Sequence, residues 1–189
     1  MKSVFLDRDG CINDLVFYPP TGDYEAPYAL DEIVMLPGAV ESARRLYEAG
    51  FLLFIVSNQA SYAKGKTSLE VIKVVSGQVE ENLRAGGAKI THAYYCYHHP
   101  KGTVPGVSIT CNCRKPRAGS LIHARDHYGV DLSKSWMVGD LDADIECGQE
   151  AGCRTILVAN PLSSARRGSS VPTLKASSLM EATENILAS

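Results

Sequence analysis

Two aspartates, Asp7 and Asp9, lie one residue apart where a short apolar run near the amino terminus gives way to a glycine-containing turn. The run is typical of a buried strand, and the carboxyl ends of such strands are where open α/β sheets bind ligands. Residues two apart in extended chain face the same side, so both carboxylates are expected to converge on one target. Two neighbouring acids repel each other unless a divalent cation or a proton lies between them. The pair therefore predicts a metal-assisted site, with two acids that cap a turn as the simpler alternative.

A second acidic group follows another apolar strand, at Asp140, with Asp144 on the helix after it. Because the carboxyl ends of parallel strands meet at one edge of a sheet, Asp140 is expected beside Asp7 and Asp9. Carboxylate oxygens are ligands for hard divalent cations, and magnesium fits this set of three acids best. The alternative is that Asp140 and Asp144 only cap the start of the helix, where the helix dipole favours acids.

Two small polar residues, Ser57 and Asn58, end a further apolar strand, and their donors suit phosphate oxygens. Lys115 stands between Arg114 and Pro116 and would add a full positive charge to the same anion. A lysine on a loop is usually solvated surface, so this role depends on where the fold places it.

Thiol and imidazole side chains form two pairs on either side of a proline- and glycine-rich segment: Cys96 with His98, and Cys111 with Cys113. Three thiolates and one imidazole complete a tetrahedral zinc site with no open position, which is the structural kind. His99 is an alternative ligand to its neighbour. The other interpretation is buried cysteines plus a surface histidine pair, but this segment has no core of its own in which to bury thiols. We therefore predict a zinc loop over residues 96–113.

Apolar strands alternate with amphipathic helices along the chain after the first strand. The predicted strands cover residues 51–56, 93–96, 136–138, 155–158 and 173–175. The predicted helices cover residues 39–47, 69–83, 121–128, 144–151 and 179–187. Strands separated by helices in this way imply βαβ units, and so a three-layer α/β/α sandwich around a mostly parallel sheet.

The chain has 189 residues, which is enough for one substantial core but not for two full domains. We therefore predict a single domain over residues 1–189. Residues 13–37 contain prolines, glycine and several aromatic residues, and are predicted to form a long ordered loop that selects the substrate. Residues 162–173 are rich in serine and are predicted to form a mobile surface loop.

Charge and hydropathy exclude several partners. The 19 basic and 21 acidic residues give a net charge of -2, so no overall field favours nucleic acid. No apolar run approaches the roughly 20 residues needed to cross a bilayer, and the amino terminus lacks the features of a secretion signal. We expect a cytoplasmic monomer that binds neither nucleic acid nor membrane. In a reducing compartment the six cysteines are expected to be metal ligands or small buried residues rather than disulfides.

Four short segments resemble, in the same order and over nearly the whole chain, the motifs of the haloacid-dehalogenase-like phosphohydrolases. They are Asp7-Arg8-Asp9-Gly10, Ser57-Asn58-Gln59, Arg114-Lys115-Pro116, and Gly139-Asp140 with Asp144. The resemblance implies a Rossmann-like sheet, magnesium dependence and covalent catalysis by an aspartate. On that basis Asp7 would attack phosphorus to form an aspartyl-phosphate, and Asp9 would protonate the leaving alcohol. Magnesium, Lys115 and the Ser57 hydroxyl would offset the charge on the phosphoryl oxygens.

The segments that hold the predicted zinc ligands resemble a narrower branch of that superfamily, which includes the heptose bisphosphate and histidinol-phosphate phosphatases. Members of this branch lack a large cap domain, which agrees with the length of this chain. The resemblance implies a small phosphorylated metabolite as substrate, such as a sugar bisphosphate, bound by Asn58, Arg114 and Tyr18. Histidinol phosphate or another sugar phosphate stays an alternative, because Lys64 and Leu141 replace an arginine and a lysine that are usual in the branch.

Two other classes of protein fit part of the pattern. A phosphoacceptor signalling domain also places acids and a lysine at the edge of a parallel sheet, but it needs neither a proton shuttle such as Asp9 nor a zinc loop. A zinc-binding interaction module without catalysis is disfavoured because all four motifs are present.

Overall fold

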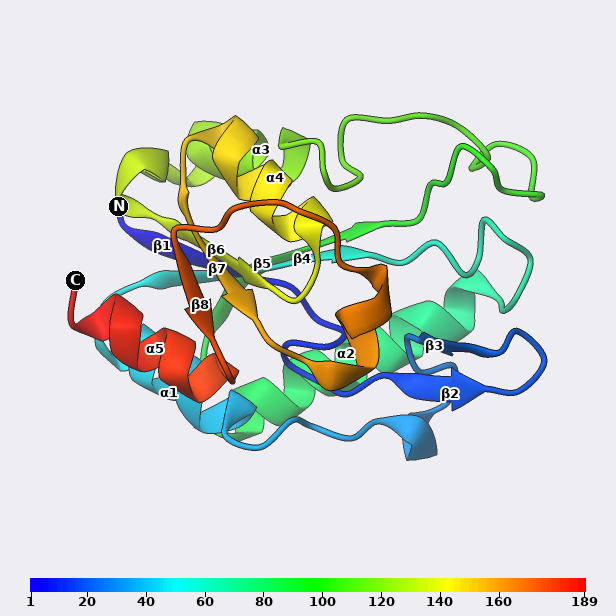
Figure 1. Ribbon diagram of the computed structural model, residues 1–189, viewed down its shortest axis with the longest axis horizontal. Coiled ribbons are helices and arrows are strands. Elements are labelled where there is room, and N and C mark those ends of the chain that lie inside the picture. The colour runs from blue at the N-terminus through cyan, green and yellow to red at the C-terminus, as the bar shows by residue number, and fades with distance from the viewer.

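A six-stranded sheet with helices on both faces forms the centre of the computed structural model, which describes residues 1–189 (Figure 1). All its strands are parallel, in the order β5-β4-β1-β6-β7-β8. Their bounds are β1 Ser3–Leu6, β4 Leu52–Asn58, β5 Ile90–Cys96, β6 Trp136–Gly139, β7 Arg154–Val158 and β8 Leu174–Ala176. This sheet confirms the predicted Rossmann-like α/β architecture.

Five α-helices and three short 3-10 helices connect the strands. The α-helices are α1 Ala39–Glu48, α2 Leu69–Ala85, α3 Gly119–Tyr128, α4 Asp142–Ala151 and α5 Leu179–Leu187. The 3-10 helices are η1 Leu30–Glu32, η2 Leu132–Lys134 and η3 Pro161–Arg166. None of the helices combines the length and the apolar character that crossing a bilayer requires.

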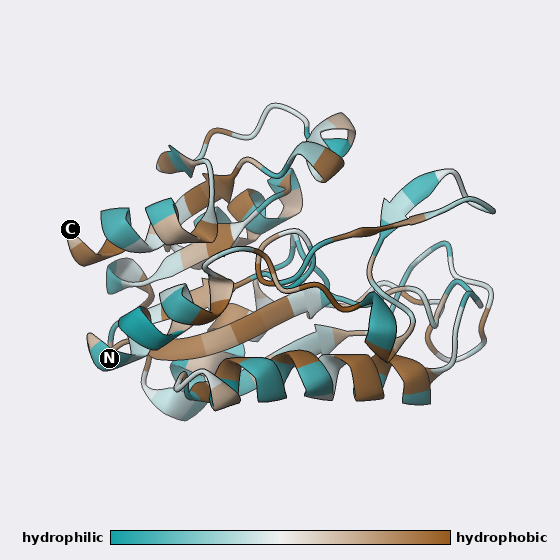
Figure 2. Cartoon of the chain, turned by 90° about the horizontal axis from the view of Figure 1, so that it is seen from below, coloured by the Kyte–Doolittle hydropathy of each residue, from teal (hydrophilic) through white to brown (hydrophobic).

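Each face of the sheet buries its own apolar cluster. Val4 and Leu6 of β1 pack with residues of α1, α2 and α5, whereas Phe5 packs with residues of α3 and α4. This division follows from the alternation of side chains along a strand. Hydrophobic residues concentrate on the central strands, while the helices alternate between hydrophobic and hydrophilic positions (Figure 2). Because β1 is covered on both faces, its continuous apolar run was a reliable signal of a central parallel strand.

The segment over residues 13–37 is more regular than predicted. It contains an antiparallel hairpin of β2 Val16–Tyr18 and β3 Asp23–Glu25, followed by η1. The prediction of a loop without strands was therefore wrong for this part. The hairpin forms because β-branched and aromatic residues precede a turn that closes with Gly22 at φ 66°. The hairpin and the loop after β5 lie at the same end of the molecule, beyond the carboxyl ends of the strands (Figure 1).

The serine-rich segment after β7 also has regular structure, because η3 occupies its first part. The side chain of Arg167 holds this segment against the sheet. Its Nε donates to the carbonyl of Asp140 at 2.9 Å, and its Nη2 donates to the carbonyl of Asn160 and to the Ser163 hydroxyl. The first part of this segment is therefore a 3-10 helix tied to the end of β6, where the sequence predicted a loop.

Candidate active site

A cavity of about 350 Å³ lies at the carboxyl ends of β1, β4 and β6, which are neighbours in the sheet. Its lining includes residues of all four motifs, together with the hairpin residues Asp23, Tyr24 and Glu25. Asp7 follows β1 directly, and its amide donates to the Val138 carbonyl of β6 at 2.9 Å. The parallel topology therefore brings side chains from distant parts of the sequence to one edge, as the sequence predicted.

Three carboxylates form a buried cluster, and two of them, Asp7 and Asp144, line the cavity. Ligand oxygens of Asp7, Asp140 and Asp144 lie within 4.8 Å of one another. Both carboxylate oxygens of Asp140 are buried and accept no hydrogen bond. A buried ionised group without partners is costly, so the environment of Asp140 calls for a cation.

Lys115 is the only cation inside this cluster. Its Nζ lies 2.7 Å from Asp7 Oδ1 and 2.6 Å from Asp144 Oδ1, and it also donates to the Val56 carbonyl at 2.5 Å. Burial opposes its charge, but the neighbouring Asp144 and Asp7 outweigh that effect and raise the pKa of Lys115. Lys115 therefore stays protonated and is not a solvated surface lysine.

The cluster carries more negative charge than Lys115 can balance. Burial raises the pKa of Asp7 well above its ordinary value, although Lys115 opposes that shift. Burial, followed by the charge of Asp144, raises the pKa of Asp140 to about 6. Three carboxylates facing one ammonium leave two negative charges when all are ionised, which is the charge that a divalent cation would compensate. The donor set consists of hard oxygens, as magnesium prefers.

The structure groups Asp144, and not the Asp9 carboxylate, with Asp7 and Asp140, and Asp9 as a magnesium ligand stays a prediction. The rule that residues two apart share a side applies to extended chain, and β1 ends at Leu6. Beyond it the chain turns, and the carbonyl of Arg8 accepts three backbone amides. The Asp9 side chain lines the cavity but is directed to other donors.

Asp144 uses both of its carboxylate oxygens within the protein. Oδ1 pairs with Lys115, and Oδ2 accepts the amide of Leu141 at 3.0 Å, at the start of α4. Asp144 therefore orients Lys115 and also caps the start of α4.

Asn58 holds the backbone of Lys115. Its Nδ2 donates to the Lys115 carbonyl at 3.0 Å, and its Oδ1 accepts the Lys115 amide at 3.1 Å. Asn58 also lines the cavity, and its predicted contact with substrate stays a prediction. Ser57 lines the cavity as predicted, with its hydroxyl 3.5 Å from Asp9 Oδ2.

The Asn58→Leu variant is expected to lower kcat by about tenfold or more with little change in KM, because Lys115 would lose its backbone support while the substrate would lose no contact. The unsatisfied peptide groups of Lys115 should also cost about 1–3 kcal/mol of stability. Steady-state kinetics and thermal unfolding measure both effects. The same change at exposed Asn112 is the control. A rise in KM with unchanged kcat would instead place the Asn58 amide on the substrate.

Tyr18, which the sequence predicted to bind substrate, is not part of the cavity lining. Its hydroxyl donates to Glu32 at 2.5 Å and accepts the amide of Tyr28 at 2.9 Å, and its ring stacks on that of Tyr28. The hairpin presents Tyr24 to the cavity in its place. Tyr24 pairs with Phe17 in the hairpin, and without knowledge of that pairing the sequence could not show which tyrosine lines the cavity.

The four predicted zinc ligands lie together. Sulfur atoms of Cys96, Cys111 and Cys113 are 3.3 to 3.6 Å apart, and His98 Nδ1 is 3.4 Å from the Cys113 sulfur. Zinc–sulfur bonds of about 2.3 Å would place sulfur atoms about 3.8 Å apart in a regular tetrahedron, so the cluster fits a tetrahedral metal closely. The Nδ1 of His99 instead accepts the Lys101 amide, which excludes it as the ligand through that atom.

The cysteine cluster lies next to Lys115 in the chain and in space. Arg114 follows Cys113 directly, lines the cavity and donates from Nη1 to the His98 carbonyl at 3.3 Å. A fixed Cys113 would therefore limit the positions that the next two residues can take.

Three buried polar residues near the site were not singled out from the sequence. Arg8 and Gln59 both donate to the Asp9 carboxylate, and Asn160 donates to the Gly10 carbonyl at 3.1 Å. A signal existed for Gln59, because it lies two residues after Ser57 at the end of a strand. Arg8 stands between two acids, where a solvated arginine was the ordinary expectation.

Comparison with known proteins agrees with this geometry. Residues 112–182 match the HAD-hydrolase-like family. The chain is 33% identical over 155 residues to D-glycero-beta-D-manno-heptose-1,7-bisphosphate 7-phosphatase of Escherichia coli K12, which covers 82% of this chain and 77% of that protein. The protein of the same name from Pseudomonas aeruginosa is 34% identical, with coverage of 82% and 79%.

A solved structure is similar over its full length. It is the D,D-heptose 1,7-bisphosphate phosphatase from B. bronchiseptica complexed with magnesium and phosphate, with a TM-score of 0.81, 26% identity and coverage of 100% of this chain and 99% of that one. The resemblance predicted from the four motifs is therefore confirmed. The chain belongs to the haloacid-dehalogenase-like phosphatases, in the family that contains the D-glycero-D-manno-heptose-1,7-bisphosphate 7-phosphatases.

Proposed function

We propose that this phosphatase removes the 7-phosphate of D-glycero-D-manno-heptose 1,7-bisphosphate, with Asp7 as nucleophile and with bound magnesium. The observation that carries the proposal is the state of the Asp7 carboxylate. Oδ1 is held by Lys115 and by the Arg8 amide at 2.8 Å, while Oδ2 accepts no hydrogen bond and the side chain lines the cavity. One oxygen is thus fixed and the other is available to attack phosphorus.

The reaction would proceed in two steps. Asp7 Oδ2 forms a bond to phosphorus while the bond to the sugar oxygen breaks, and Asp9 gives that oxygen a proton. Water, deprotonated by Asp9, then attacks phosphorus and releases phosphate from Asp7. Lys115 and the Ser57 hydroxyl offset the charge on the phosphoryl oxygens.

Asp7 and Asp140 are the carboxylates that would hold magnesium. The partnerless oxygens of Asp140 and the uncompensated charge of the cluster support this assignment. When bound, the ion supplies electrostatic stabilisation of the phosphoryl group.

A structural zinc ion is the second proposed metal, held by three thiolates and His98. The short distances between sulfur atoms support it, because uncoordinated thiols gain little from such close packing. The site has four protein ligands and no place for a substrate, so its role would be to stabilise the loop.

The charges at the cavity mouth favour a substrate with a second anionic group. Lys66 is ion-paired with Glu25 at 2.6 Å, whereas the lining cations Lys64, Arg114 and Arg166 have no short ion pair with an acid. These side chains lie outside the Asp7 cluster and can contact a distal phosphate. A bisphosphate would use both regions, and a monophosphate only one.

The Arg114→Ala variant is therefore expected to raise KM for the heptose bisphosphate by about 10- to 100-fold, because a charge-assisted contact to the distal phosphate is lost. Hydrolysis of p-nitrophenyl phosphate, which has no second phosphate, should change by less than about threefold. Steady-state kinetics with both substrates measures the difference. Arg117→Ala, a neighbouring exposed arginine that does not line the cavity, is the control. Equal losses for both substrates would show that Arg114 acts on the transferred phosphate.

A substrate panel tests the proposed function as a whole. Purified protein with magnesium would be given the heptose bisphosphate, histidinol phosphate, other sugar phosphates and nucleotides, and released phosphate would be measured. We expect the highest kcat/KM for the heptose bisphosphate. Selective hydrolysis of histidinol phosphate or of an unrelated sugar phosphate would overturn the assigned substrate but not the assigned phosphatase activity.

A further inference from the structure

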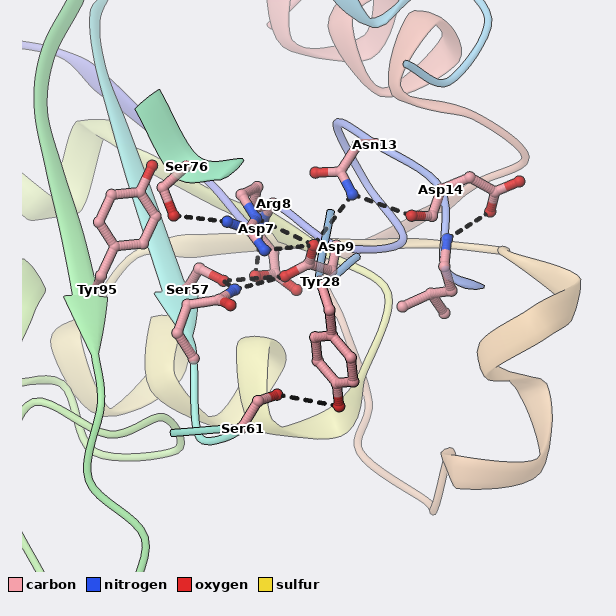
Figure 3. Close-up of polar contacts among 12 residues, drawn as sticks. Asp7, Arg8, Asp9, Asn13, Asp14, Tyr28, Ser57, Ser61, Ser76 and Tyr95 are labelled. Carbon is pink, nitrogen blue, oxygen red and sulfur yellow. Dashed lines mark hydrogen bonds and ion pairs between the residues drawn. The ribbon is translucent and has the colours of Figure 1, made fainter. Parts of the chain in front are cut away.

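The Asp9 carboxylate is held by an unusually complete set of buried donors (Figure 3). Arg8 lies beside Oδ1, with Nε at 3.0 Å and Nη2 at 2.9 Å, and Asn13 Nδ2 donates to the same oxygen at 3.0 Å. Gln59 Nε2 donates to Oδ2 at 2.6 Å. Both Asp9 oxygens therefore have defined partners, whereas Oδ2 of Asp7 accepts no hydrogen bond.

The donors themselves are fixed by residues behind them. Arg8 has no solvent-exposed surface, its Nη1 donates to the Ser76 hydroxyl of α2 at 2.7 Å, and its guanidinium lies over the Tyr95 ring (Figure 3). Gln59 is also buried, and its Nε2 donates to the Ser57 hydroxyl at 2.9 Å as well. The network thus ties Asp9 to α2 on one side and to the end of β4 on the other.

Burying a guanidinium is expensive unless its charge and its hydrogen bonds are satisfied. Replacing a buried ion pair with apolar residues is often neutral or stabilising, so stability alone is a weak reason for Arg8 to be here. Fixed donors matter more for catalysis. A carboxyl group that must lie within hydrogen-bond distance of the leaving oxygen needs a defined position, because small displacements lower the rate by large factors.

We propose that Arg8 and Gln59 are positioning residues that aim the Asp9 carboxyl group at the leaving oxygen. Gln59 sets Oδ2 and Arg8 sets Oδ1, so that rotation about the two side-chain torsions of Asp9 is suppressed. The inference rests on the proposed role of Asp9 as proton donor. It assigns to Arg8 no contact with phosphate, although an arginine beside a phosphoryl site would ordinarily be expected to make one.

The dependence on the leaving group separates positioning from a merely structural role. When a sugar phosphate reacts, the bond from phosphorus to the alkoxide oxygen breaks as Asp7 bonds to phosphorus, and the proton of Asp9 moves to that oxygen. When p-nitrophenyl phosphate reacts, the departing phenolate is stable without a proton. A misplaced Asp9 carboxyl group should therefore slow leaving-group release from the sugar phosphate much more than from p-nitrophenyl phosphate.

The experiment compares Gln59→Leu and Arg8→Lys with the wild type, using the heptose bisphosphate, or whichever sugar phosphate the wild type hydrolyses, and p-nitrophenyl phosphate. The quantity compared is kcat/KM, which reports the steps up to release of the leaving group and not the later attack of water, in which Asp9 acts on every substrate. We expect kcat/KM in Gln59→Leu to fall about 10- to 100-fold for the sugar phosphate and by less than about threefold for p-nitrophenyl phosphate. Arg8→Lys keeps the charge but cannot donate to Asp9 and Ser76 in the same fork, so it should show the same selectivity.

Two further variants make the outcome decisive. Asp9→Asn is the reference for a lost proton donor, and Gln78→Leu repeats the glutamine change at an exposed position of α2 as the matched control. If Asp9→Asn itself shows no preference for the better leaving group, the proposed role of Asp9 is wrong. If Asp9→Asn shows it while folded Gln59→Leu loses both activities equally or neither, the positioning role is wrong. If Arg8→Lys does not fold, as thermal unfolding would show, the Gln59 result alone decides.

Discussion

The Asp7→Asn variant is expected to lose at least about 10⁴-fold in kcat with every phosphate ester, including p-nitrophenyl phosphate. An amide nitrogen or oxygen in place of Oδ2 cannot form a hydrolysable phosphate ester, and no other side chain at the cavity offers an oxygen held in the same way. The loss should therefore be independent of the leaving group. This distinguishes Asp7 from Asp9, whose replacement should largely spare the first step, measured as kcat/KM, for the substrate with the better leaving group.

The change also removes a partner of Lys115, so the fold must be checked. Lys115 keeps its ion pair with Asp144 and its bond to the Val56 carbonyl, which should hold it in place. Far-UV circular dichroism and the thermal unfolding midpoint measure whether it does. Asp131→Asn, which removes an exposed carboxylate far from the cavity, is the matched control and should be fully active. Phosphatase activity within tenfold of wild type in folded Asp7→Asn would refute the nucleophile assignment.

Cys113→Ser is expected to have the second-largest effect. A serine hydroxyl is a poor zinc ligand, and the remaining three ligands would bind the ion much more weakly. Because Cys113 immediately precedes Arg114 and Lys115, release of the loop should displace both cations from the cavity. We expect less than one zinc ion per chain and a loss in kcat/KM of about 100-fold or more. A markedly lower unfolding midpoint should accompany these losses.

The matched control is Cys153→Ser, which changes a buried cysteine outside the cluster. That variant should retain its zinc, measured by elemental analysis of protein prepared in metal-free buffers. Removing the metal from the wild type with a chelator, followed by restoring zinc, should abolish and then recover the activity measured with magnesium present. Wild-type protein that carries no zinc and is nevertheless stable and active would rule out a structural zinc ion in this loop.

The sheet and most of the site could be predicted because their signals are local. Continuous apolar runs such as Val4 to Leu6 identify central parallel strands, and the edge at which parallel strands end is the same for all of them. The sequence therefore predicts that Asp7, Asp140 and Lys115 lie together, and the structure brings them together. The cysteine and histidine pairs were equally recognisable, since a loop rich in proline and glycine offers thiols no apolar core.

The parts that could not be predicted depend on how the chain turns after each strand. The carboxylates of Asp7 and Asp9 were expected to converge, but the turn that begins after Leu6 directs them to different partners. Asn58 offered donors suited to phosphate, yet the turn at the end of β4 places them on the Lys115 backbone. In both cases the residue type indicated a polar role correctly, and only the local backbone geometry determines its partner.

The orientation of the hairpin residues could not be predicted from the sequence for a similar reason. Its aromatic residues indicated an ordered segment over the site, but the pairing of β2 with β3 places Tyr24 and not Tyr18 in the cavity lining, and that pairing cannot be used until the strands are known. The buried position of Arg8 is a tertiary effect of a different kind. It requires Ser76 and Tyr95 from distant segments, which no motif in the sequence links to the first strand.

The most direct test of the account is to trap the phosphorylated enzyme. Wild-type protein with magnesium would be mixed with excess substrate, quenched within milliseconds and reduced with borohydride, which converts an aspartyl-phosphate to homoserine. Peptide mass spectrometry then identifies the modified residue. We expect homoserine at position 7, and none at position 9 or in protein mixed without substrate. Reduction at another residue, or none at all in protein that is hydrolysing substrate rapidly, would contradict it.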